Sequence, residues 1–139
     1  MRDFTVIVPT WNMGRYLEPL FRSIVDSPFA EVIEEILFVC EKSNDGSESI
    51  IAKIIEDQGS RLPRVRMIQP EHRKGLFIAR YLGAVNATTK KIFFIDSRIT
   101  LPKATGAAMP ELSRKYPAMS SIVDIDVEKN IFCLYYYLE

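Results

Sequence analysis

Short apolar runs alternate along this chain with segments in which apolar residues recur at helical spacing. Four runs predict buried strands, at residues 4–8, 36–40, 65–68 and 92–95. Apolar positions three or four residues apart predict intervening helices, at residues 14–25, 45–59 and 76–87. Strands that alternate with single helices are typical of right-handed βαβ crossovers, so the pattern predicts an α/β fold with a mostly parallel sheet.

The alternation weakens after residue 102. A short helix is predicted around residues 109–115, followed by two β-rich runs at 119–127 and 130–137. Because the turn-like residues 128–130 separate these runs, they predict a C-terminal β-hairpin. A length of 139 residues fits a single domain. Within this domain, residues 4–102 form the part built from alternating strands and helices, and residues 103–139 add a short helix and the hairpin.

The composition excludes several classes of protein. Lys plus Arg and Asp plus Glu both number 18, so no net charge favours nucleic acid or an anionic membrane as a partner. No apolar run approaches the roughly 20 residues that a membrane-spanning helix needs. The chain begins directly in a predicted strand without a signal-peptide pattern, and Cys40 and Cys133 lack metal-ligand spacing. We therefore expect a cytoplasmic protein with two reduced thiols.

Polar side chains follow the first and fourth predicted strands at their carboxyl ends. Ligands of open α/β sheets bind just beyond these ends. The first strand leads into Pro9, Thr10 and Asn12, and the fourth leads into Asp96 and Arg98. Simpler alternatives are a helix cap at Asn12 and a structural pairing of Arg98 with Asp96 or another acid.

The second and third strands lead into further polar segments. Glu41 and Ser43 follow the second strand, where a carboxylate can accept a hydrogen bond from a nucleobase or a ribose. Lys74 and Gly75 precede the third predicted helix, whose N-terminus favours anions, and Arg80 lies on its second turn. The alternative for both segments is a solvated, charged loop.

Four segments, taken in order, resemble the motifs of a known family. Residues 8–12 read Val-Pro-Thr-Trp-Asn, and residues 40–47 read Cys-Glu-Lys-Ser-Asn-Asp-Gly-Ser. Residues 75–83 read Gly-Leu-Phe-Ile-Ala-Arg-Tyr-Leu-Gly, and residues 96–98 read Asp-Ser-Arg. These segments resemble the motifs of the family 2 inverting glycosyltransferases across residues 4–102. The resemblance implies the three-layer α/β/α, Rossmann-like GT-A fold, which binds a nucleotide-diphospho-sugar.

The chain departs from the family pattern at several positions. Cys40 replaces the first acid of the second motif, whereas Glu41 keeps a carboxylate at the position that usually contacts the base. Lys42 stands where glycine is usual, and Tyr81 replaces an asparagine. Arg98 replaces the acid of Asp-x-Asp that usually contributes most to metal binding.

The resemblance implies a site for a UDP- or GDP-linked sugar. Its members would be Pro9, Thr10, Asn12, Glu41, Ser43, Lys74, Gly75, Arg80, Asp96 and Arg98. Mg²⁺ or Mn²⁺ would bridge diphosphate oxygens as a Lewis acid, and Asp96 alone would hold it weakly beside the Arg98 cation. We therefore expect a metal role that is weakened, or replaced by direct contacts of Arg98 and Lys74 with the diphosphate.

The implied activity is transfer of a glycosyl group to an acceptor hydroxyl with inversion, as in the hexosyltransferase class. The acceptor site and the catalytic base of the family are not recognisable in the sequence, so no catalytic residue is nominated. Residues 103–139 are either the start of an acceptor region or a different ending. The alternative is a non-catalytic GT-A-like module that binds nucleotides or regulates, which the changes at Cys40 and Arg98 favour. The sequence leaves open the donor sugar, the acceptor and the oligomeric state.

Overall fold

A single parallel sheet forms the centre of the molecule. The computed structural model describes residues 1–116, so the predicted hairpin lies outside the described residues. The sheet has the order β3-β2-β1-β4, and each pair of neighbours is parallel. Its strands are β1 (Phe4–Thr10), β2 (Ile33–Cys40), β3 (Arg64–Ile68) and β4 (Lys91–Phe94). The predicted α/β fold with a parallel sheet is confirmed for this part of the chain.

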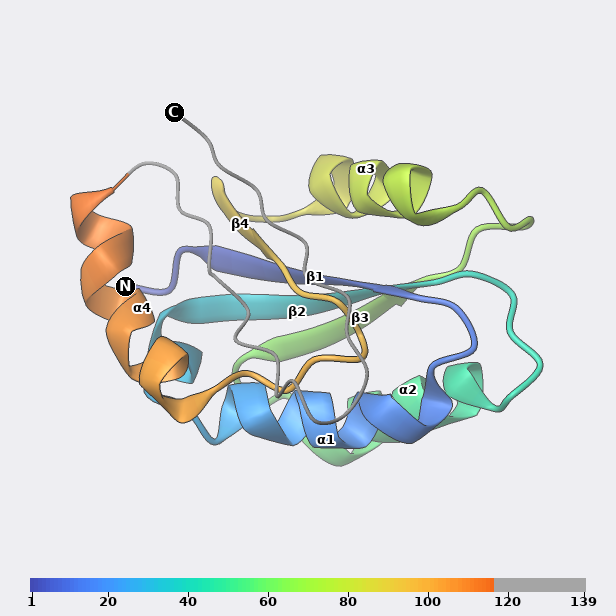
Figure 1. Ribbon diagram of the computed structural model, residues 1–139, viewed down its shortest axis with the longest axis horizontal. Helices are drawn as coiled ribbons and strands as arrows, with labels where there is room; N and C mark the ends of the chain where they lie inside the picture. The colour runs from blue at the N-terminus through green and yellow to red at the C-terminus, as the bar shows by residue number, and fades with distance from the viewer. Residues whose placement is uncertain (117–139) are drawn as a thin grey trace, which may run out of the picture.

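Helices cover both faces of the sheet, which gives three layers (Figure 1). One face carries α1 (Gly14–Val25) and α2 (Ser47–Gln58), and the other carries α3 (Leu76–Asn86). The helix α4 (Lys103–Lys115) packs beside η1, a short 3₁₀ helix at Pro28–Val32. None of the helices in residues 1–116 has the length and apolar character that crossing a membrane requires.

The core is divided between the two faces of the sheet. The larger cluster lies under α1 and α2, and includes the buried Phe29, whose ring meets Phe4 and Phe93 edge to face. The smaller cluster joins Ile7 and Val39 to Ala79 of α3. At Gly83 of α3, an added Cβ would lie 2.3 Å from Ile7 Cγ2. The absence of a side chain there lets the helix approach the sheet closely.

Strand β1 and helix α4 are among the elements that extend beyond their predicted bounds. Strand β1 continues through Pro9 to Thr10, because pairing with β4 ends at Ile7 and the missing N–H of proline is tolerated where a strand has one neighbour. Helix α4 begins at Lys103 rather than near residue 109. Its Gly106 has Ser27 so close that an added Cβ would lie 2.8 Å from Ser27 Cβ, so this glycine packs the helix against η1.

Candidate functional site

The turn after β1 is bonded to the loop after β2. The Asn12 N–H donates to Ser43 Oγ at 3.0 Å, and Asn12 Oδ1 accepts from the Asn44 N–H at 2.9 Å. Asn12 has φ 51°, in the left-handed region that asparagine tolerates better than most residues. The alternative of a helix cap at Asn12 is wrong, because Met13 holds that position. Asn12 instead joins two strand ends.

Asp45 binds the N-termini of two helices at once. Its Oδ2 accepts from the Gly14 N–H at 2.8 Å, and its Oδ1 accepts from the Ser47 N–H at 3.0 Å and from the Ser47 hydroxyl. Slight burial opposes ionisation, but these hydrogen bonds outweigh it and hold the pKa of Asp45 below its ordinary value. The carboxylate therefore stays ionised at neutral pH and is engaged by the protein itself.

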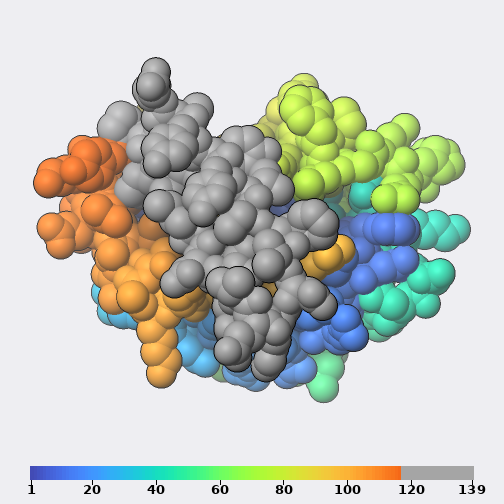
Figure 2. All heavy atoms as spheres, in the orientation of Figure 1, coloured from blue at the N-terminus to red at the C-terminus, as the bar shows by residue number. Residues whose placement is uncertain are grey.

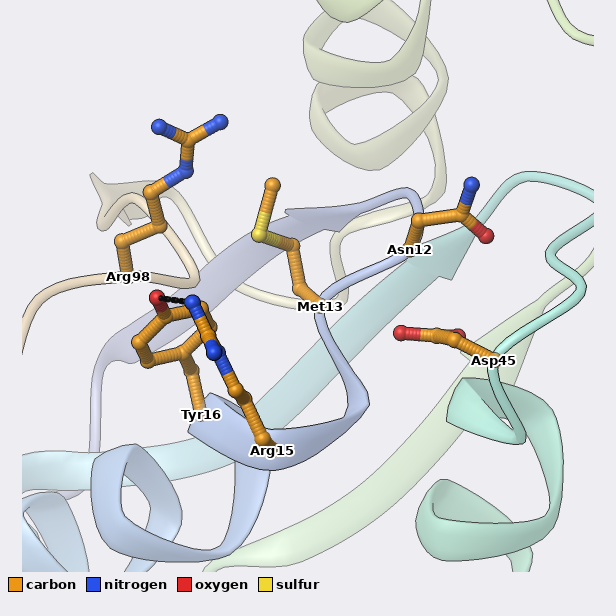
Figure 3. A pocket seen from close by; sticks show the side chains of 6 residues that line it. All are labelled: Asn12, Met13, Arg15, Tyr16, Asp45 and Arg98. Carbon is orange, nitrogen blue, oxygen red and sulfur yellow. Dashed lines mark hydrogen bonds between the residues drawn. The ribbon is translucent and has the colours of Figure 1, made fainter.

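A hollow of about 470 Å³ lies beside these loops, at the ends of β1, β2 and β4 (Figure 3). Arg15 and Tyr16 come from the first turn of α1, and the Arg15 guanidinium donates to the Tyr16 hydroxyl. Arg98 enters from the segment after β4. The sequence pattern missed Arg15 and Tyr16, although they follow the same strand end as Asn12. The residues that line the hollow are Asn12, Met13, Arg15, Tyr16, Asp45 and Arg98.

Glu41 bonds to the backbone that leads into α3. It is 4% exposed, and its Oε1 accepts from the Lys74 N–H and, at 2.7 Å, from the Gly75 N–H. Its own N–H donates to Thr10 O at 2.9 Å. Gly75 has φ 89°, a conformation that disfavours other residues. The structure thus gathers Thr10, Glu41, Lys74 and Gly75, and a carboxylate of the protein is already bonded to N–H groups where the sequence predicts an anion site.

Arg73 and Trp11, the sequence neighbours of Lys74 and Thr10, are in contact with each other. The guanidinium carbon of Arg73 lies 3.4 Å from the centroid of the Trp11 ring, and the indole is 37% exposed. Figures 1 and 2 show the segments after β1, β2 and β3 gathered at one end of the molecule, at the right of both views. Trp11 lies within the first family-like motif, but neither Trp11 nor Arg73 is among the predicted site residues. The signal available was a basic loop and an aromatic residue at neighbouring strand ends.

Asp96 and Arg98 form a separate local turn. The Arg98 N–H donates to Asp96 Oδ1 at 3.0 Å, and both side chains are exposed. Within residues 1–116, these two side chains make no ion pair with each other, and no group of three His, Cys, Asp or Glu could hold a metal ion. The residues fit a cation bound by Asp96 together with substrate phosphates better than one held by the protein alone.

Pro9 and Arg80 are the remaining predicted members of the site. Pro9 is buried inside β1. The Arg80 guanidinium lies 5.9 Å from the Phe94 ring centroid, and its buried Nε has no hydrogen-bond partner in the described part of the chain. The contacts above join Thr10 to Glu41, Lys74 and Gly75, and Asn12 to Ser43, whereas Asp96, Arg98 and Arg80 make no hydrogen bond to these groups in the described residues. The ligand-binding roles of all ten residues stay predictions.

The fold is similar to that of solved glycosyltransferases with the GT-A architecture. S. aureus TarS aligns with a TM-score of 0.64 over 82% of this chain and 19% of its own, at 25% identity. A shorter form of TarS, in complex with UDP-GlcNAc, gives 0.64 at 26% identity and covers 82% and 30% of the two chains. Mannosyltransferase PcManGT from Pyrobaculum calidifontis, in complex with GDP-Man and Mn2+, gives 0.65 at 22% identity and covers 78% and 33%.

The chain belongs to glycosyl transferase family 2, whose match covers residues 5–109. The resemblance inferred from the motifs is thereby confirmed. Polypeptide N-acetylgalactosaminyltransferase 10 of Rattus norvegicus is 32% identical over 94 residues, which are 67% of this chain and 15% of that protein. Glycosyltransferase GlyA of Streptococcus pneumoniae serotype 4 is 32% identical over 93 residues, 67% of this chain and 12% of GlyA. The chain spans less than a sixth of these curated relatives.

Proposed function

We propose that residues 1–116 contain the donor-binding part of an inverting glycosyltransferase, a site for the nucleotide diphosphate of an activated sugar. The observation that carries this proposal is the charge around the hollow. Arg15 and Arg98 both line it, whereas Asp45, the acid among the lining residues, is engaged by backbone N–H groups. Guanidinium groups bind phosphate oxygens through charge-assisted hydrogen bonds, so this lining fits a diphosphate.

The proposed donor is a UDP- or GDP-linked sugar, and the proposed reaction is transfer of the glycosyl group to an acceptor hydroxyl. Support comes from membership of the family and from TarS, whose structure is known with UDP-GlcNAc and with UDP. The acceptor site and the base that would activate the hydroxyl are not assigned to any residue. The ten predicted site residues are proposed to contact the donor or to shape its site.

Metal dependence is proposed to be weak. A cation would supply Lewis acidity to the diphosphate, and Asp96 is the residue that would hold it. Arg98 places a guanidinium two positions away, where its charge opposes a bound cation and can itself neutralise phosphate oxygens. This chain would therefore bind the nucleotide with little help from Mg²⁺ or Mn²⁺.

A second candidate function is a non-catalytic module that binds a nucleotide through the same site. The exchange of an acid for Arg98 favours it, because an arginine can replace the charge of a metal but not its ability to accept substrate oxygens as ligands. Under this alternative, the protein binds UDP or GDP and transfers no sugar.

Thermal unfolding with UDP, GDP, UDP-GlcNAc and GDP-Man, each with Mn²⁺ or with a chelator, tests the proposed function. A ligand at about 100 times its Kd adds about 2.7 kcal/mol to stability, which would raise Tm by on the order of 10 °C in a domain of this size. We expect such a rise with at least one nucleotide in the chelator. A rise that requires Mn²⁺ would contradict the role of Arg98, and no rise with any nucleotide would contradict the site. Hydrolysis or transfer of the sugar then separates the enzyme from the module.

A further inference from the structure

The outer face of α3 is apolar. Phe77, Tyr81 and Val85 lie four residues apart on one side of this helix, and they are 83%, 59% and 57% exposed. Ala79 and Gly83, on the opposite side, pack against the sheet. Surface helices of globular proteins usually carry polar side chains on the face that points away from the core. A contiguous apolar face in that position indicates an interaction surface.

The helices on the other face of the sheet show the usual pattern. The exposed positions of α1 include Arg15, Glu18 and Arg22, and those of α2 include Lys53 and Glu56. Figure 1 shows α3 on the face of the sheet opposite α1 and α2. The main contacts of α3 are with β1 and β2, through its inner side. The apolar outer face is therefore a property of α3 in particular.

The charge around α3 is of one sign. Residues 72–95 contain no Asp or Glu, although the whole chain carries 18 acidic and 18 basic residues. The Lys and Arg residues of this stretch are Arg73, Lys74, Arg80, Lys90 and Lys91. Lys91 pairs with Asp3, whereas Arg73 and Lys90 are exposed in the segments before and after α3. The balanced net charge of the chain thus conceals a local excess of positive charge beside the apolar face.

We propose that the outer face of α3 binds the surface of an anionic lipid bilayer. Phe77, Tyr81 and Val85 enter the boundary between headgroups and acyl chains, and Arg73 and Lys90 contact lipid phosphates. Helices with an apolar, aromatic face and flanking cations lie in this boundary, where tyrosine is enriched. The 11 residues of α3 are too few to span a bilayer, so the contact is peripheral.

Charge complementarity favours a bilayer over a second copy of this chain. Two copies that met through this face would bring the cations at Arg73 and Lys90 of each copy close to those of the other. No acid in residues 72–95 could pair with them, and like charges in contact oppose association. An anionic bilayer instead presents negative phosphates and an apolar interior to the same face.

A single indole placed in α3 tests the contact directly. Trp11 is the only tryptophan of the chain, so Phe77→Trp in a Trp11→Phe background gives a fluorophore on the outer face of α3 alone. Leu112→Trp in the same background is the control, at an exposed position of α4. The full chain is mixed with vesicles of phosphatidylcholine, either alone or with an equal amount of phosphatidylglycerol. With phosphatidylglycerol present, we expect the emission of Phe77→Trp to shift to shorter wavelength and to be quenched by brominated acyl chains. The emission of Leu112→Trp should not change.

Flotation of the wild type and of surface variants with the same vesicles measures the contributions to binding. Phe77→Ser should weaken binding to anionic vesicles at least about tenfold, the lower end of what burial of a phenylalanine side chain contributes. Arg73→Gln with Lys90→Gln should weaken it about twentyfold, because each cation near an anionic surface contributes about fivefold. Lys103→Gln with Arg114→Gln removes the same charge from exposed positions of α4 and should keep most of the binding. High salt should weaken binding of the wild type.

Several outcomes would overturn the inference. Equal binding to both kinds of vesicle would contradict the role of charge, and binding that the variants at Phe77, Arg73 and Lys90 leave intact would place the contact elsewhere. Failure of the full chain to bind either vesicle would mean that another occupant, a second copy or residues 117–139, covers this face. Phe77 is 83% exposed, so Phe77→Ser removes no packing from the core. Nucleotide binding by a chain that fails with vesicles contradicts this inference and leaves the proposed function intact.

Discussion

Replacing Arg66 by methionine removes the counterion of a buried carboxylate. Glu35 of β2 is 1% exposed, and its Oε2 accepts from Arg66 Nε at 2.7 Å. Its Oε1 accepts from the Thr88 N–H and hydroxyl, both at 2.9 Å, and from the Thr5 hydroxyl at 3.1 Å. Arg66 also donates to Asn86 O, at the end of α3. The group therefore joins β1, β2 and β3 to the end of α3.

The loss in the free energy of unfolding depends on which contacts of Glu35 remain after the substitution. Breaking a buried ion pair from one side costs about 3–5 kcal/mol. The Arg66 side chain is 44% exposed, and Glu35 would keep its bonds to Thr88 and Thr5, so the loss is smaller. We expect Arg66→Met to lower the free energy of unfolding at pH 7 by about 2–3 kcal/mol. Urea unfolding followed by circular dichroism measures it.

The stability difference between the wild type and Arg66→Met should become smaller as the pH falls. Burial by itself raises the pKa of Glu35, but hydrogen bonds from Arg66 and Thr88 and the guanidinium charge outweigh it and lower the pKa below its ordinary value of 4.5. The folded pKa lies below the unfolded one, so the charged group stabilises the wild type above about pH 4.5, and this contribution is lost as the pH falls through the folded pKa. A protonated Glu35 needs no counterion, so the two proteins should approach each other in stability in acid.

Arg64→Met is the matched control. Arg64 pairs with Glu34 at the same 2.7 Å, but these side chains are 55% and 27% exposed. Because exposed ion pairs contribute little, this variant should lose less than about 1 kcal/mol. Equal losses for Arg64→Met and Arg66→Met would refute the argument from burial. So would an Arg66→Met deficit that is as large at about pH 3.5 as at pH 7.

Three further predictions concern single positions. Gly83→Ala should destabilise the fold by about 2–3 kcal/mol in urea unfolding, because its Cβ would lie 2.3 Å from Ile7 Cγ2; an unchanged midpoint would show that α3 can move outward at no cost. Burial, and then the negative charge of a nearby glutamate, raises the pKa of the Cys40 thiol to about 11. In a Cys133→Ser background, iodoacetamide should therefore react with Cys40 at pH 8 only after the protein unfolds. Rapid reaction of the native protein would count against this burial. Arg98→Asp should make the thermal shift with UDP or GDP depend on Mn²⁺, whereas an unchanged metal response would argue against Asp96 as a metal ligand.

The sequence predicted the strands and helices well where local patterns decide them, and less well where a distant partner does. Strand β2 begins at Ile33 rather than at residue 36, because Glu35 is buried in it as a charge paired with Arg66 of β3. A glutamate reads as a strand boundary until that partner is known. Helix α4 was predicted short because the pattern weakens after residue 102, whereas the observed helix includes Gly106, which fits the close contact with Ser27.

For the candidate site, the sequence predicted the positions of the residues but not the directions of their side chains. Parallel strands bring their carboxyl ends to one edge, so the order of elements was sufficient to place Thr10, Asn12, Glu41 and Asp96 there. The direction of each side chain was not predictable. Glu41 turns to the backbone of the 71–75 loop, and the contact of that loop with Trp11 depends on two residues whose sequence separation leaves no periodic signal.

The distribution of charge at this edge argues for recognition of the ligand by side chains. In many α/β proteins, free N–H groups at helix N-termini bind phosphate. Here Asp45 accepts from the first N–H of α1 and Glu41 accepts from the N–H groups just before α3, so two of the protein's own carboxylates occupy those positions. A diphosphate in the hollow would then meet the guanidinium groups of Arg15 and Arg98. Removing either arginine should therefore weaken binding of nucleoside diphosphates more than binding of the uncharged nucleoside.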